Sequence, residues 1–212
     1  MSHDILQPIP QGGYGAYDEE NRKIQGIADE LKRLCRIHEE EFGDSQTNGG
    51  CLEIEQRITE QYAKTHNLWI PIDYMFDLGV PGPSGNENDT YVSDNTIFKV
   101  NNLFNSGSIV KLLEKILLHN IIFPNTFYKF YAFTGYDGRS IMPVLQQDRI
   151  SDAHPANQEM IDTYMIALGF EKSSKEGHYT NNIYEVWDVV PRNVLVDEDG
   201  DLYVVDAEIK VI

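Results

Sequence analysis

The sequence predicts an α+β fold, because helical apolar spacing and short strand-like runs both occur along its 212 residues. In several segments apolar residues recur every three or four positions, which is typical of helices that cover a core. Other segments are short runs of β-branched and aromatic residues bounded by turn-forming residues, which is typical of strands in hairpins. A chain of this length suits one domain, or a small domain with an extra helical segment.

The N-terminal part is predicted to contain two helices. Residues 1–17, with their prolines and glycines, are interpreted as a flexible lead-in. The first helix is expected from Asp18 to about Gly43, and a polar stretch separates it from a second helix at roughly residues 51–67. Neither helix shows residues that point to chemistry, so we expect both to pack on or beside the main domain.

A segment rich in glycine and proline, residues 79–85, precedes two strand-like runs at 90–92 and 96–100. A loop of this composition is more often a turn than a ligand site, so it identifies no site by itself. Lys99 is more informative, because it stands among apolar residues of the second run. A lysine on one face of such a strand needs a partner or a ligand.

The middle of the chain alternates between helices and strands. A helix is predicted at 108–118, and it carries Glu114, the one acidic residue between Asp94 and Asp137. Then come two strand-like runs with a turn between them, a helix that stops at Gly169, and a hairpin. These later elements are expected at residues 127–133, 140–145, 156–168 and 170–184, with the turn at 136–139.

The C-terminal part has polar residues at distinctive spacing. Asp188 is followed by Pro191 three positions on and by Asn193 five positions on, and Asp206 comes thirteen positions after Asn193. Between Asn193 and Asp206, two strand-like runs flank an aspartate-rich turn that contains Gly200, as in a hairpin. Such a hairpin would bring Asn193 and Asp206 side by side. An acidic surface hairpin is the alternative, but it explains neither Pro191 nor Asn193.

This spacing resembles the catalytic core of the protein-kinase superfamily. The sequence is most similar to the kinase-like domain found in polyvalent proteins of bacterial phages and conjugative elements. The phrases that carry this likeness are residues 98–102, 167–170 and 187–197, and the resemblance runs from about Gly79 to Glu208.

The resemblance implies a fold and its divisions. We expect a protein-kinase-like α+β fold with an antiparallel small-lobe sheet, a truncated large lobe and N-terminal helices. The divisions would be 1–67 for the lead-in and two helices, 68–147 for the small lobe and hinge, and 148–212 for the truncated large lobe with the catalytic loop.

The resemblance also implies ATP and Mg²⁺ as cofactors and assigns a role to each matching residue. Lys99 would contact the α- and β-phosphates while paired with Glu114, although Glu114 could instead pair with Lys111 or Lys115 on its own helix. The remaining roles are Asp188 as catalytic base, Asn193 and Asp206 as metal ligands, Gly82 and Gly85 in the loop over the phosphates, and Val144, Leu145 and Gln146 in an adenine-binding hinge at 144–147.

Two departures from the family pattern affect these expectations. The pair before Asp188 is Val186-Trp187 rather than His-Arg, so the catalytic loop needs a different support. The residues after Asp206 are Ala207-Glu208 rather than Phe-Gly, and the sequence ends six residues beyond Asp206. We therefore expect no activation segment and no substrate-binding lobe of normal size.

Charge and composition limit the partners. With 34 acidic and 17 basic residues, the net charge is −17, which argues against nucleic acid or an anionic membrane as a partner. Cys35 and Cys51 lack metal-ligand spacing. Without a secretory segment or a long apolar run, a cytoplasmic location is expected.

Three functions remain open from the sequence. The first is an ATP- and Mg²⁺-dependent phosphotransferase that acts on a protein or small-molecule hydroxyl. The second is a catalytically weak, nucleotide-binding pseudokinase that serves as an interaction module. The third is an acidic scaffold or decoy whose charge mimics nucleic acid.

Overall fold

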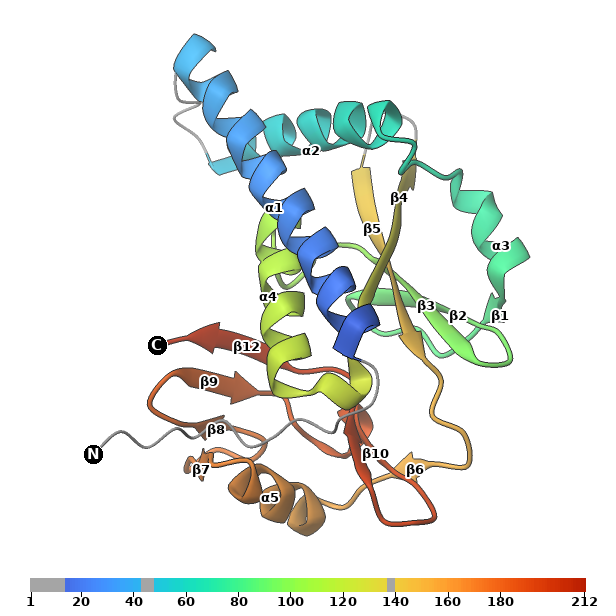
Figure 1. Cartoon of the computed structure of the whole chain (residues 1–212), viewed down its shortest axis with the longest axis vertical. Helices are drawn as coiled ribbons and strands as arrows, with labels where there is room; N and C mark the ends of the chain where they lie inside the picture. Colours follow the sequence, from blue (N-terminus) through green and yellow to red (C-terminus); the bar gives the residue numbers. More distant parts are fainter. Residues whose placement is uncertain (1–13, 43–47, 137–139) are drawn as a thin grey trace.

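The computed structural model describes residues 14–42, 48–136 and 140–212 (Figure 1). Residues 1–13 of the predicted lead-in, 43–47 of the predicted polar stretch and 137–139 of the predicted turn lie outside the described residues. The described part mixes helices with antiparallel sheets, so the α+β class is confirmed. None of its helices has the length and apolar character that a membrane span requires.

Five strands form an antiparallel sheet in the order β1-β2-β3-β5-β4. They are β1 (Val80–Pro81), β2 (Asn88–Val92), β3 (Thr96–Asn101), β4 (Lys129–Tyr136) and β5 (Ser140–Asp148). Phe98 and Val100 pack with Met75 on one face, which is covered by η1 (Ile72–Tyr74) and α3 (Met75–Leu78). Because side chains alternate along a strand, Lys99 lies on the opposite face, where α4 (Ile109–Ile122) packs.

The N-terminal helices α1 (Tyr14–Phe42) and α2 (Asn48–Thr65) pack on the same face as α4. Figure 1 shows α1 lying along α4 and β4, with α2 crossing near the far end of β4 and β5. Ile24 and Leu31 of α1 are fully buried in this core. Glu20 accepts a 2.6 Å hydrogen bond from the backbone N–H of Phe130, and Lys23 donates one of 2.6 Å to the Phe130 carbonyl.

The chain beyond β5 folds into two small antiparallel sheets, β11-β10-β6 and β12-β9-β8-β7, with one helix against them. Apolar side chains from α5 and from these strands share a single buried cluster that includes Ile161, Val186 and Val194. The elements are β6 (His154–Pro155), α5 (Gln158–Ala167), β7 (Glu171–Lys172), β8 (Tyr179–Thr180), β9 (Tyr184–Trp187), η3 (Pro191–Asn193), β10 (Val194–Val196), β11 (Leu202–Val204) and β12 (Glu208–Val211).

The C-terminal end of α4 joins the two parts of the molecule through buried His119. Its ring lies against the rings of Phe123 and Tyr128, and its Nε2 atom is 3.3 Å from the Thr126 hydroxyl, in η2 (Pro124–Thr126). That hydroxyl donates to the carbonyl of Val204 in β11 at 2.6 Å. Burial lowers the pKa of His119 from 6.5 to about 3, so the ring is neutral in the folded protein at neutral pH.

The packing of α1 predicts a large difference between two isoleucines of that helix. Ile24 is 0% exposed and Ile37 is 37% exposed. Ile24→Ala should lower the free energy of unfolding by about 2–5 kcal/mol, because it leaves a cavity under α1. Ile37→Ala, the matched control, should lower the free energy of unfolding by clearly less. Urea unfolding measures both, and equal losses would contradict the burial of this face of α1.

Neutral, buried His119 predicts an acid-dependent loss of stability. As the pH falls from 6.5 toward about 4, the unfolded chain binds a proton at this residue and the folded protein does not, so unfolding becomes easier. In that range the wild type should lose up to about 1.4 kcal/mol more per pH unit than His119→Gln. Urea unfolding between these pH values measures the two slopes. A His119→Gln slope equal to that of the wild type would disprove the assignment.

Candidate functional site

The β10–β11 hairpin places Asn193 and Asp206 at its open end. Val194 faces Val204 in the ladder, and the Val205 N–H donates to the Asn193 carbonyl at 2.9 Å. Asp206 follows directly, so the pairing brings the two predicted metal ligands together. At the closed end, the Asp197 carboxylate accepts bonds from the amides of residues 199 and 201 and from the Tyr203 hydroxyl. The aspartate-rich turn is therefore held by its own side chain.

Asp188 stands between β9 and η3 and is bonded directly to Asn193. The Asn193 amide donates to the carbonyl and to the carboxylate of Asp188, each at 2.8 Å. Arg192 forms an ion pair with the same carboxylate. The backbone of Asp188 has a φ of +62°. Residues other than glycine, asparagine and aspartate rarely adopt this conformation.

Arg192 is a site residue that the sequence analysis missed. The four-residue spacing from Asp188 was no signal for this ion pair, because the pairing rule for that spacing applies to α-helices and Asp188 has a positive φ. Val186, where the family pattern has histidine, is fully buried in the apolar core, and the ring of Trp187 lies 6.0 Å from that of His178. Val186 and Trp187 thus hold the start of the loop through β9, and Arg192 and Asn193 contact the Asp188 carboxylate itself.

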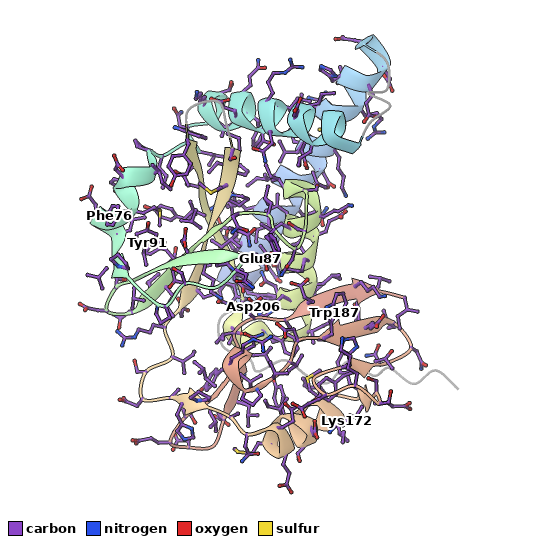
Figure 2. All side chains as sticks on the ribbon, turned by 180° about the vertical axis from the view of Figure 1, so that it is seen from behind. Phe76, Glu87, Tyr91, Lys172, Trp187 and Asp206 are labelled. Carbon is purple, nitrogen blue, oxygen red and sulfur yellow. The ribbon has the colours of Figure 1, made fainter. Side chains whose placement is uncertain are left out.

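Lys99 reaches the hairpin from the five-stranded sheet. Its ammonium donates to the Val205 carbonyl at 2.9 Å and to the Tyr128 hydroxyl at 3.1 Å. The accepting carbonyl is one residue before Asp206, so the two residues that were expected to reach one triphosphate are neighbours. Burial lowers the pKa of Lys99, while the negative charge of Asp206 acts in the opposite direction. Figure 2 shows Asp206 below Glu87, where the two parts of the molecule meet.

Tyr128 completes the surroundings of Lys99. Its hydroxyl donates to the Val205 carbonyl at 3.0 Å, and its ring lies 4.9 Å from the Lys99 ammonium. Burial raises the pKa of Tyr128 well above 10.0, and the nearby charge of Asp206 adds to that rise. The phenol is therefore neutral and serves as a hydrogen-bonding partner. Tyr128 lies just before β4, and nothing in the sequence pattern distinguished it from the other aromatic residues of the run 127–133.

The expected Lys99–Glu114 ion pair is wrong. The Glu114 side chain is 46% exposed and pairs with Lys32 of α1 at 2.6 Å. On α4 the buried side is formed by Leu112, Leu113 and Ile116, and Glu114 lies on the side that meets α1. The next residue, Lys115, faces the site instead, where it contacts Glu87 and Glu208.

The hinge predicted at 144–147 is also wrong in position. Val144, Leu145 and Gln146 lie inside β5, which pairs with β3 on one side and with β4 on the other. Their backbone groups belong to these two ladders and are not available to hydrogen-bond a base. The strand runs to Asp148, because buried Gln147 continues it and donates to the Thr126 carbonyl at 2.6 Å.

The loop with Gly82 and Gly85 connects β1 to β2. The Gly82 N–H donates to the Thr90 carbonyl, and a Cβ at Gly82 would lie 2.8 Å from the Thr90 hydroxyl oxygen. Gly82 therefore allows close packing on β2, whereas Gly85 borders open space. At the end of this loop, Glu87 reaches Lys115, a contact that sequence reasoning did not anticipate.

Comparison with known proteins identifies the family of the chain. The family model described as a serine/threonine/tyrosine kinase found in polyvalent proteins matches residues 53–212. Searches of curated proteins and of solved structures found no match. The matched range contains Lys99, Asp188, Asn193 and Asp206, and α1 precedes it. Because the match covers most of the sequence, the chain belongs to this family of kinases found in polyvalent proteins.

Proposed function

We propose that the protein is a phosphotransferase with a protein-kinase-like fold that uses ATP and Mg²⁺ and transfers the γ-phosphate to the hydroxyl of a protein or a small molecule. The observation that carries this proposal is the buried ammonium of Lys99, bonded to the residue before Asp206. The Lys99 ammonium from the sheet and the Asp206 carboxylate from the hairpin would then reach the same ligand, as a metal-bound triphosphate requires.

The fold suits such a site. The five-stranded sheet with α4 would be the small lobe, and the small sheets with α5 would be a shortened large lobe. The part after β5 supplies Asp188, Asn193 and Asp206, and β3 supplies Lys99. The reaction would take place in the cytoplasm, where ATP is available.

The donors around Asp206 fit a magnesium ion. The described residues contain no cluster of three or more acidic, histidine or cysteine side chains that could hold a metal by themselves. Mg²⁺ in such enzymes is usually bound by one or two protein oxygens together with phosphates and water. Asp206 would supply a carboxylate, and Asn193 would supply its amide oxygen, because its amide nitrogen already donates to Asp188. Bound Mg²⁺ would neutralise charge on the phosphates.

Asp188 would orient the acceptor hydroxyl and take its proton. Its side chain is 40% exposed, so an acceptor can reach it, and its carboxylate is contacted by Arg192 and Asn193. Lys99 would contact the α- and β-phosphates from the opposite side of the site.

The proposed site predicts that MgATP stabilises the protein. At about one hundred times its dissociation constant, a ligand of the folded state adds about 2.7 kcal/mol, which raises the melting temperature by several degrees. Asp206→Asn should lose the part of the shift that depends on Mg²⁺, because an amide is a poorer ligand than a carboxylate. Asp201→Asn, at an exposed position of the same hairpin, is the control. No shift in the wild type, or an unchanged shift in Asp206→Asn, would refute the proposed site.

Substitution of Asp188 tests transfer separately from binding. Asn is the suitable replacement, because it tolerates the positive φ of this position better than alanine does. Asp188→Asn should lower γ-phosphate transfer by about 10² to 10⁴-fold and keep the thermal shift with MgATP. Transfer from labelled ATP to protein, small-molecule hydroxyls or water measures the loss. A folded Asp188→Asn protein with wild-type transfer would rule out the catalytic role, and a wild type that binds without transfer would be a binding module.

A further inference from the structure

Lys115 lies at the centre of a partly buried group of charges that the sequence pattern did not predict. Its ammonium is 2.9 Å from a carboxylate oxygen of Glu208 and 3.4 Å from one of Glu87. The Asn105 amide donates to both carboxylates, at 3.2 Å and 3.0 Å. Four segments therefore meet here: α4, the end of the β1–β2 loop, the segment between β3 and α4 that carries Asn105, and β12, which begins two residues after Asp206.

These charges are largely, but not fully, shielded from water. The exposed fractions of the Lys115, Glu87 and Glu208 side chains are 13%, 7% and 20%. Burial by itself acts to lower the pKa of Lys115, but the charges of Asp206, Glu87 and Glu208 outweigh it and raise the pKa. Lys115 is thus held in its charged form beside the carboxylates.

One carboxylate oxygen in this group remains unsatisfied. Oε1 of Glu87 is buried and has no hydrogen-bond partner among the residues that the structure describes. A buried charge without full compensation is costly, and Lys115 is the cation that contacts Glu87. If the Lys115 charge were removed, Glu87, Glu208 and Asp206 would be left as a group of like charges at the place where ATP phosphates would bind.

We propose that Lys115 is a positioning residue of the nucleotide site, which fastens the β1–β2 loop through Glu87 to the segment after Asp206 through Glu208. This inference rests on the proposed function for the identity of the ligand. The link itself is a property of the protein without nucleotide. In this arrangement Lys115 of α4 would hold the site in place by binding the carboxylates of Glu87 and Glu208. Glu114 of the same helix pairs with Lys32 of α1 instead.

The link can be tested without nucleotide by hydrogen exchange of backbone amides. Lys115→Met keeps the length and apolar stem of the side chain and removes its charge. Residues 82–88 and 205–211 should then exchange at least about tenfold faster, because breaking a buried ion pair lets these segments open locally. Lys115→Arg should retain slow exchange. Lys111→Met, at an exposed position of the same helix, should match the wild type.

A second arm measures MgATP binding by calorimetry. Lys115→Met should weaken binding about tenfold or more, since uncompensated carboxylates repel the phosphates, and Lys115→Arg should stay near the wild-type value. If Lys115→Met does not fold, Glu87→Gln provides the test, because it should speed exchange of residues 82–88 without affecting α4.

The outcomes separate this inference from the proposed function. Unchanged exchange in a folded Lys115→Met protein, or acceleration spread evenly over the whole chain, would overturn the positioning role even if MgATP binds normally. Faster exchange of Lys115→Met confined to the two segments, together with a wild-type protein that does not bind MgATP, would support the link and refute the proposed nucleotide site.

Discussion

The hydrogen bond from the Lys99 ammonium to the Val205 carbonyl is the contact on which the candidate site depends. It joins residues that are 106 positions apart in the sequence, one in the five-stranded sheet and one at the end of the β10–β11 hairpin. A buried ammonium must be satisfied by acceptors or by negative charge. Tyr128 supplies a second acceptor and Asp206 supplies charge. The need to satisfy this one cation therefore holds the sheet and the hairpin in a single arrangement.

The part of the site that could be predicted from sequence is the part that local structure determines. Asn193 and Asp206 are joined by one short hairpin, and Asp188 is only five residues from Asn193. Turn chemistry and strand spacing are enough to bring such residues together. The lysine in β3 was also recognisable, because a charged residue within an apolar strand stands out. For the same reasons, the positions of most strands and helices followed from the sequence.

The parts that could not be predicted depend on tertiary contacts. Successive residues of a helix differ by about 100° in direction, so the choice between Glu114 and Lys115 depended on the rotation of α4. That rotation follows from the burial of Leu112, Leu113 and Ile116 in the core shared with α1 and the sheet, and it leaves Glu114 beside Lys32 of α1. The end of β5 was misjudged because Gln146 and Gln147 suggest a surface segment, whereas pairing with β3 and β4 keeps them in the sheet.

The contacts of β4 have a consequence for the solubility of the molecule. β4 is at the edge of its sheet, and unpaired backbone groups on such an edge invite strands of other molecules to add to it. Here Glu20 and Lys23 of α1 form hydrogen bonds with the backbone N–H and carbonyl of Phe130. The segment before α3 does the same for Phe133, through the Leu68 carbonyl and the Ile70 N–H. The N-terminal helix, which precedes the range matched by the family, thus shields an edge strand. A protein shortened to the family range would expose that edge and become prone to aggregation through it.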